Sequence, residues 1–162
     1  MPGSVKTKMP DPVFTDTMQI GIIVRDLDAT VKRYEEDYGI GPWQFFDVNP
    51  EIATDLREYG TQPISPTRNA TTKVGNVWWE LTQPLDTEGI FARFLAEKGE
   101  GVHHIAVKTP SFEGAIAMQK EVLPLSGSFM DIQVAYLPTK KDLGILLEVF
   151  KGFDDDEPNS EG

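Results

Sequence analysis

The sequence reads GEGVHHIAV over residues 99–107, and this stretch marks the point at which an earlier pattern begins again. The earlier copy is QIGIIV at residues 19–24. Both runs are short and apolar, as buried strands are, and each is followed by apolar side chains at helical spacing. Repetition of one supersecondary unit predicts two similar modules within the chain.

The segments that follow each run predict the rest of the module. In the first copy we expect a helix from Asp28, its N-cap, to Gly39, its C-cap. Residues 43–48 and 52–59 are predicted strands, residues 60–68 a loop, and residues 71–81 a hairpin that turns at Gly75-Asn76. In the second copy we expect a helix over 112–122 ended by Pro124, then strands at 128–131, 133–137 and 144–150, with a hairpin tip at 140–142.

These elements give the order β-α-β-β-β twice, so the predicted fold class is α+β. Two tandem βαβββ modules, at about 16–85 and 101–152, would be joined by a helix at about 88–98 within a single domain, 16–152. Together they would form a curved eight-stranded sheet around a metal-centred cleft. Residues 1–15 are expected to be a flexible N-terminal arm, and residues 153–162 a disordered acidic tail.

Composition narrows the class of protein. The chain has 162 residues and a net charge of −11, which disfavours nucleic acid and anionic membranes as partners. It has no cysteine, so disulfides and thiolate sites are excluded. No apolar run approaches the roughly 18 residues that a membrane span needs. The N-terminus has no apolar signal core, and a cytoplasmic location is expected.

One polar residue interrupts each of four apolar runs: Gln19, Glu80, His104 and Glu148. A carboxylate is costly to bury unless a positive charge compensates it. One divalent cation would compensate the whole set. Nitrogen and oxygen ligands without sulfur suit Zn, Ni, Co, Mn or Mg. A ring-cleaving iron dioxygenase is disfavoured because its site normally needs two histidines.

Simpler interpretations of these residues stay open. Each glutamate could pair with Lys or Arg, His104 could be a core histidine, and Gln19 could make an ordinary buried hydrogen bond. His103 would face away from the cleft if His104 faces it, because side chains alternate along a strand. Aromatic residues that could contact a ligand or only pack in the core are Trp43, Trp78 and Phe150.

Four stretches together resemble the vicinal oxygen chelate superfamily, over nearly all of residues 19–150. They are QIGIIVRDLD at 19–28, VGNVWWELTQPL at 74–85, GEGVHHIA at 99–106 and LGILLEVF at 143–150. The third stretch is most similar to the methylmalonyl-CoA epimerase branch. The resemblance implies one metal ligand from the first and last strand of each module, which are again Gln19, Glu80, His104 and Glu148. The epimerase branch has His and Gln at the first two positions, whereas the present set resembles a branch of glyoxalase I.

The resemblance implies a metal-dependent isomerase, epimerase or lyase that removes a proton next to a carbonyl through a metal-stabilised enolate. Glu148 is the first candidate base, Glu80 the second catalytic candidate, and Glu58 a further one. The substrate would be a small molecule with vicinal oxygens, such as an acyl-CoA, a hemithioacetal or an oxoacid. A homodimer is also expected. Basic residues that could bind a phosphate are Arg57, Arg68, Lys73 and Lys108.

The alternative is a non-catalytic drug-binding or resistance protein of the same fold. Its cleft would hold an aromatic ligand against Trp78 and Phe150 without metal.

Overall fold

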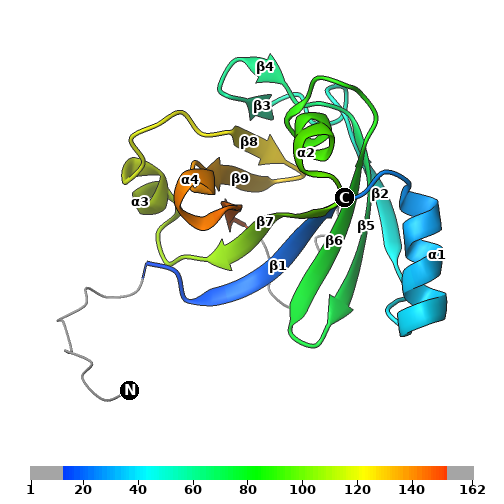
Figure 1. Ribbon diagram of the computed structural model, residues 1–162. Coiled ribbons are helices and arrows are strands. Elements are labelled where there is room, and N and C mark those ends of the chain that lie inside the picture. Colours follow the sequence, from blue (N-terminus) through cyan, green and yellow to red (C-terminus); the bar gives the residue numbers. More distant parts are fainter. Residues whose placement is uncertain (1–12, 153–162) are drawn as a thin grey trace.

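The computed structural model describes residues 13–152, in which one mixed sheet carries four short helices (Figure 1). The expected tail and most of the expected arm lie outside the described residues. The strands are β1 (Asp16–Ile23), β2 (Gln44–Val48), β3 (Arg57–Glu58), β4 (Gln62–Pro63), β5 (Thr67–Val74), β6 (Val77–Pro84), β7 (Gly101–Lys108), β8 (Leu125–Phe129), β9 (Ile132–Leu137) and β10 (Leu146–Lys151). The helices are α1 (Leu27–Tyr38), α2 (Ile90–Lys98), α3 (Phe112–Ala117) and α4 (Lys140–Leu143).

The strand order repeats about the centre of the sheet. It is β2-β5-β6-β1-β7-β10-β9-β8-β3-β4, so β1 and β7, the first strands of the two modules, lie side by side and antiparallel. Each pairs in parallel with the last strand of its own module, β6 or β10. The predicted repeat is therefore present. The strands that carry the singled-out polar residues are four consecutive strands around the contact between the modules, β6-β1-β7-β10.

The sheet has ten strands, so the expectation of eight was wrong. Residues 52–59, predicted to be a strand, contribute only the two-residue β3, while β5 begins inside the predicted loop, at Thr67. The Asn49 side chain accepts hydrogen bonds from the backbone amides of Glu51 and Ile52, which turns the chain there. Segment 49–66 then runs from β2 at one edge to β8 at the other, where β3 pairs.

The helices also differ in detail from the prediction. Asp26, and not Asp28, is the N-cap of α1, because its carboxylate accepts from the Ala29 amide at 3.0 Å. Gly39 ends α1 as expected, with φ 67°. Helix α3 ends at Ala117 instead of 122, and Met118 and Val122 are both 62% exposed, so further turns would bury little. The expected hairpin tip at 140–142 is the short helix α4.

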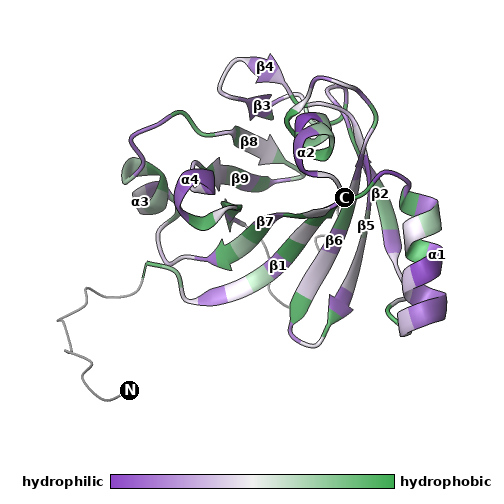
Figure 2. Cartoon of the chain, in the orientation of Figure 1, coloured by the Kyte–Doolittle hydropathy of each residue, from purple (hydrophilic) through white to green (hydrophobic). Residues whose placement is uncertain are grey.

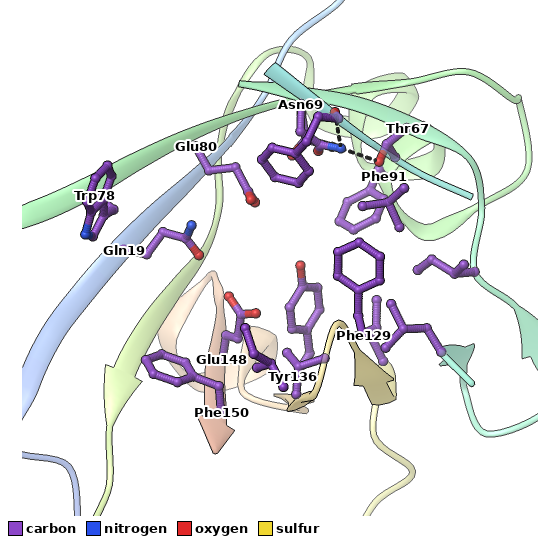
Figure 3. A pocket seen from close by; sticks show the side chains of 18 of the residues that line it. Gln19, Thr67, Asn69, Trp78, Glu80, Phe91, Phe129, Tyr136, Glu148 and Phe150 are labelled. Atoms are coloured by element: carbon purple, nitrogen blue, oxygen red, sulfur yellow. Dashed lines mark hydrogen bonds between the residues drawn. The ribbon is translucent and has the colours of Figure 1, made fainter. Parts of the chain in front are cut away.

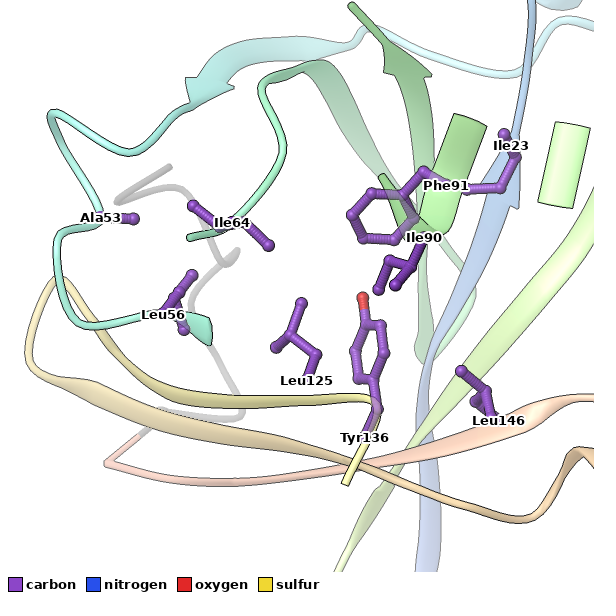
Figure 4. Packing of buried hydrophobic residues seen from close by; sticks show 9 residues of the cluster. All are labelled: Ile23, Ala53, Leu56, Ile64, Ile90, Phe91, Leu125, Tyr136 and Leu146. Carbon is purple, nitrogen blue, oxygen red and sulfur yellow. The ribbon is translucent and has the colours of Figure 1, made fainter. Parts of the chain in front are cut away.

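Residues that alternate along a strand point to opposite faces of the sheet, and helices α1 and α3 pack against one of these faces. The other face is left for a cleft. Leu81 and Ala70 pack against α1, whose other side is hydrophilic (Figure 2). Val149 packs in a cluster with Phe112 of α3. A third cluster joins α2 to segment 49–66 and β9 (Figure 4); its buried members are Ile23, Ala53, Leu56, Ile64, Ile90, Phe91, Leu125, Tyr136 and Leu146. Within residues 13–152, no helix is long and apolar enough to cross a membrane.

We expect Gly127→Ala to destabilise the attachment of segment 49–66. Gly127 in β8 has φ 137°, and a Cβ there would lie 2.2 Å from the Asp55 carbonyl oxygen. The free energy of unfolding in urea should fall by about 1–3 kcal/mol, as overpacking usually costs. The neighbouring Ser126→Ala, which adds no atom, should change it by less than about 0.5 kcal/mol. Equal stability of the two variants would contradict this account.

Candidate functional site

A cleft occupies the concave side of the sheet (Figure 3). Its volume is about 860 Å³ including the open mouth. Central strands supply one wall, and segment 49–66, α2 and β8 supply the other, through Leu56, Ile64, Phe91 and Phe129 among others. Because these side chains are mainly apolar, the cleft has a low dielectric in which any charged group is strongly felt.

The structure brings the predicted set together. Gln19, Glu80 and Glu148 line the cleft, and their polar ends point toward one another in Figure 3. His104 is fully buried directly behind them. Its Nε2 lies 3.5 Å from Glu80 Oε1 and 3.7 Å from Glu148 Oε1. Alternation along the strands puts all four on the inner face, as the sequence pattern predicted.

The position of His104 depends on a glycine in the neighbouring strand. Gly21 in β1 is the register partner of His104 in β7. A Cβ on Gly21 would lie 2.1 Å from the His104 ring, so any larger residue would displace the imidazole. The glycine in the QIGIIV run is therefore part of the site.

His103 is not among the residues that line the cleft, as expected, but its ring contacts that of His104, which strict alternation along the strand does not predict. The β1–β7 register shifts between Gly21 and Ile22, which pair with His104 and Val102, so His103 is an extra residue in a β-bulge. The bulge brings the Nδ1 atoms of the two imidazoles to 2.9 Å. The His103 ring also packs against Phe91 and Phe94 of α2. The strict alternation assumed from the sequence fails at this bulge.

The two histidines have opposite electrostatic environments. Burial, with the nearby His104 and Lys140, lowers the pKa of His103 to about 2, so this ring stays neutral. Burial also opposes protonation of His104, but the Glu80 and Glu148 carboxylates outweigh it and raise the pKa of His104. When His104 donates its Nδ1–H to neutral His103, its Nε2 presents a lone pair to the cleft, as a metal ligand must.

Glu148 is the most perturbed carboxylate of the site. Burial raises its pKa to about 7; His104 opposes this shift and Glu80 reinforces it. Its Oε1 is buried and has no hydrogen-bond partner among the described residues. A buried carboxylate oxygen without a partner is costly, so its position favours a bound cation or a proton-transfer role.

Tyr136 is a site residue that the sequence did not single out. It is the register partner of Glu148, its ring stacks on His104 with centroids 4.8 Å apart, and its hydroxyl lies 3.5 Å from His104 Nε2. Burial and the surrounding carboxylates raise the pKa of its hydroxyl well above the usual range, so it stays a neutral donor. A tyrosine in an apolar strand has no distinguishing pattern, and only the register next to Glu148 could have indicated it.

The donor set fits a divalent ion. Within residues 13–152, no group of three or more His, Cys, Asp and Glu side chains already stands in metal-binding positions. The distances from His104 Nε2 to Glu80 and Glu148, 3.5 and 3.7 Å, are nevertheless close to the roughly 3–4 Å that separates two ligands of one ion. The Glu148 Oε1 atom, which has no hydrogen-bond partner among the described residues, is a further oxygen donor beside His104.

Other candidates have different roles in the structure. Glu58 is buried but does not line the cleft; its oxygens accept from Ser65 and from the Ile90 amide at the start of α2. Trp43 is a core residue whose Nε1 donates to the Ile40 carbonyl, whereas Trp78 and Phe150 line the cleft.

The two candidate phosphate-binding residues on strand β5 do not come together to form a site. Arg68 and Lys73 are five residues apart on one strand and therefore lie on opposite faces. Arg68 pairs with Asp28 at 3.1 Å, and the Lys73 ammonium lies over the Trp78 ring. Arg57 on β3 donates to the backbone carbonyls of Thr54 and Leu56.

Comparisons with known proteins agree with this geometry. A family model of the glyoxalase/bleomycin resistance protein/dioxygenase superfamily matches residues 18–122. A search of curated proteins gave no match. Among solved structures, a Streptomyces coelicolor methylmalonyl-CoA epimerase variant in complex with 2-nitronate-propionyl-CoA is 26% identical, with a TM-score of 0.62, covering 90% of this chain and 99% of that one.

Two further structures extend the comparison. A methylmalonyl-CoA epimerase in complex with methylmalonyl-CoA and NH4+ is 26% identical, with a TM-score of 0.62 and coverage of 90% of this chain and 99% of that one. The methylmalonyl-CoA epimerase from Mycobacterium tuberculosis is 17% identical, with a TM-score of 0.61 and coverage of 90% and 93%, and at that identity it supports the fold alone. The homodimer and the cytoplasmic location stay predictions.

We expect His103→Phe to destabilise the metal-free protein. Phenylalanine keeps the packing on α2 but leaves the buried Nδ1 of His104 without its partner, which costs about 1–3 kcal/mol of unfolding free energy. Urea unfolding measures this, and ¹⁵N NMR reports the His104 tautomer. The control is Val102→Ala, at a residue 42% exposed, which should stay within about 0.5 kcal/mol. Unchanged stability and tautomer in His103→Phe would show that the contact has no orienting role.

Proposed function

Because the chain belongs to the glyoxalase/bleomycin resistance protein/dioxygenase superfamily, we propose that it is a metal-dependent epimerase, isomerase or glyoxalase-type lyase. The reaction would move a proton on a carbon next to a carbonyl. The observation that carries this proposal is the buried Glu148 carboxylate, whose Oε1 has no hydrogen-bond partner among the described residues and lies 3.7 Å from His104 Nε2, which is itself 3.5 Å from Glu80. The epimerase structures at 26% identity support the same reaction class.

Four side chains would hold the cation: Gln19, Glu80, His104 and Glu148. When bound, it would supply Lewis-acid stabilisation of the negative charge that develops on a substrate oxygen. The two carboxylates balance a divalent charge, His104 contributes Nε2, and Gln19 an amide oxygen. His103 and the bulge would keep the His104 ring in place, as partners of metal-ligating histidines commonly do.

Glu148 would act as the base. Burial raises the pKa of its carboxyl to about 7 in the metal-free protein, which makes the carboxylate a stronger proton acceptor than an exposed one. Glu80, which comes from β6 on the same wall of the cleft, would return the proton, and would abstract it when the reaction runs in reverse. Two carboxylates on different strands suit a reaction in which a planar intermediate gains its proton from either face.

The rest of the cleft would protect the intermediate from water. Segment 49–66 closes one side through Leu56 and Ile64, and Phe91 and Phe129 complete that wall. The buried Tyr136 hydroxyl is a neutral donor beside His104, available to an oxygen of the intermediate.

We expect the purified, tag-free protein to contain about one divalent metal per chain by elemental analysis. His104→Ala and Glu148→Ala should each lose it, because each variant removes a ligand. Glu113→Ala, which removes an exposed carboxylate paired with Lys151, is the matched control and should retain the metal. A wild type that stays metal-free after incubation with Zn, Ni, Co or Mn would favour the non-catalytic binding protein, with a ligand resting on Trp78 and Phe150.

Glu148→Gln should abolish most of the proton transfer while metal stays bound, because the amide can coordinate but cannot accept the proton. Exchange of α-protons in D₂O, followed by NMR with hemithioacetals, α-hydroxy ketones and acyl-CoA thioesters, should slow about 10²–10⁴-fold. Glu113→Gln is the exposed control. Near-normal exchange in a metal-loaded Glu148→Gln variant would assign the base elsewhere, with Glu80 next to test.

A further inference from the structure

The cleft is divided into a polar half and an apolar half. Gln19, Glu80 and Glu148 form the first, and Figure 3 shows Phe91 and Phe129 across the cleft from them. Phe46, Ile132 and Val134 also line the cavity. Asn69 and Thr67 are polar, but they hydrogen-bond to each other at 2.9 Å, so they need no ligand to satisfy them. A molecule whose oxygens occupy the polar half would therefore rest its remaining atoms on hydrocarbon.

The charges of the cleft argue against an anionic substrate. Among the described residues that line it, the charged ones are Glu80 and Glu148, and none is Lys or Arg. A divalent cation would be balanced by these two carboxylates. A further carboxylate or phosphate inside the cleft would then be a desolvated charge without a partner, which is strongly unfavourable.

The apolar half of the cleft is lined from several directions. Its walls come from three separate parts of the chain, which are β2, the start of α2 and the β8–β9 hairpin, with Leu56 and Ile64 of segment 49–66 above them. Aromatic side chains from β2, α2 and β8, namely Phe46, Phe91 and Phe129, face this space, and such side chains favour a flat aromatic partner.

Building on the proposed function, we propose that the substrate is an uncharged molecule that carries two vicinal oxygens on an aryl-sized hydrophobic body, such as an aryl α-hydroxy ketone. The oxygens would meet the polar half, and the ring would lie against Phe46, Phe91 and Phe129. The Glu148 carboxylate takes the proton from the carbon next to the carbonyl, the C–H electron pair forms the C=C bond of the enolate as the C=O π pair moves onto oxygen, and these shifts reverse when a proton returns to carbon. No co-reactant is consumed.

The test compares two ketones that differ in the hydrophobic group attached to the carbonyl. 2-Hydroxyacetophenone and hydroxyacetone share the C(O)–CH2OH group, with phenyl in place of methyl. Because the methyl protons of hydroxyacetone are also α-protons, exchange is followed at the CH2OH carbon of both. With the metal-loaded protein in D₂O, we expect kcat/KM for α-proton exchange to be at least roughly tenfold higher for the phenyl ketone, from the additional apolar area buried. Binding of both ketones is measured separately by saturation-transfer NMR, with the same order expected.

Substitutions of two neighbouring residues on β2 test where the phenyl ring of the preferred ketone binds. Phe46 lines the cleft, whereas its neighbour Phe45 is 51% exposed on the other face of β2. Phe46→Ala should reduce the phenyl-to-methyl ratio at least about threefold, and Phe45→Ala should leave it unchanged. Equal loss of the ratio in both variants would overturn the assignment of the ring to this wall.

The outcomes separate the two proposals. Tighter binding of the phenyl ketone without exchange of either ketone would support the substrate class and overturn the reaction. Equal or weaker binding of the phenyl ketone would overturn the substrate class. Faster exchange of acetyl-CoA or methylmalonyl-CoA than of the phenyl ketone would overturn it too, while leaving the reaction supported.

Discussion

The antiparallel contact between β1 and β7 is the constraint on which the site depends. Gly21 leaves open the space that the His104 ring fills, and the same pairing joins the two modules. Each of these strands lies beside the last strand of its own module, so Glu80 and Glu148 arrive next to His104 from both sides. The site thus exists because the modules meet through their first strands, and neither module supplies it alone.

Burial then determines what these groups can do. A neutral His103, a protonatable His104 and a carboxyl with a pKa of about 7 stand within one apolar enclosure. In water the same side chains would titrate near their ordinary values. The hydrocarbon that closes the cleft therefore contributes to the chemistry as well as to stability, since it makes every nearby charge matter more.

Sequence reasoning predicted the repeat, the helix end at Gly39, the turn at Gly75-Asn76 and the convergence of Gln19, Glu80, His104 and Glu148. These depend on local pattern and on alternation along strands. It failed where the outcome depended on contacts distant in sequence. Residues 52–59 are apolar enough for a strand, but Leu56 is buried by tertiary packing instead. The contact between His103 and His104 depends on a shift in register against β1, and Tyr136 acquires its role only as the neighbour of Glu148.

Segment 49–66 lies within the sequence of the first module, but its short strands form the edge of the sheet beside the second module. Through β3 it covers the outer side of β8, which would otherwise present free backbone groups to other chains. The strands that now form that border have only two residues each, too few to template aggregation.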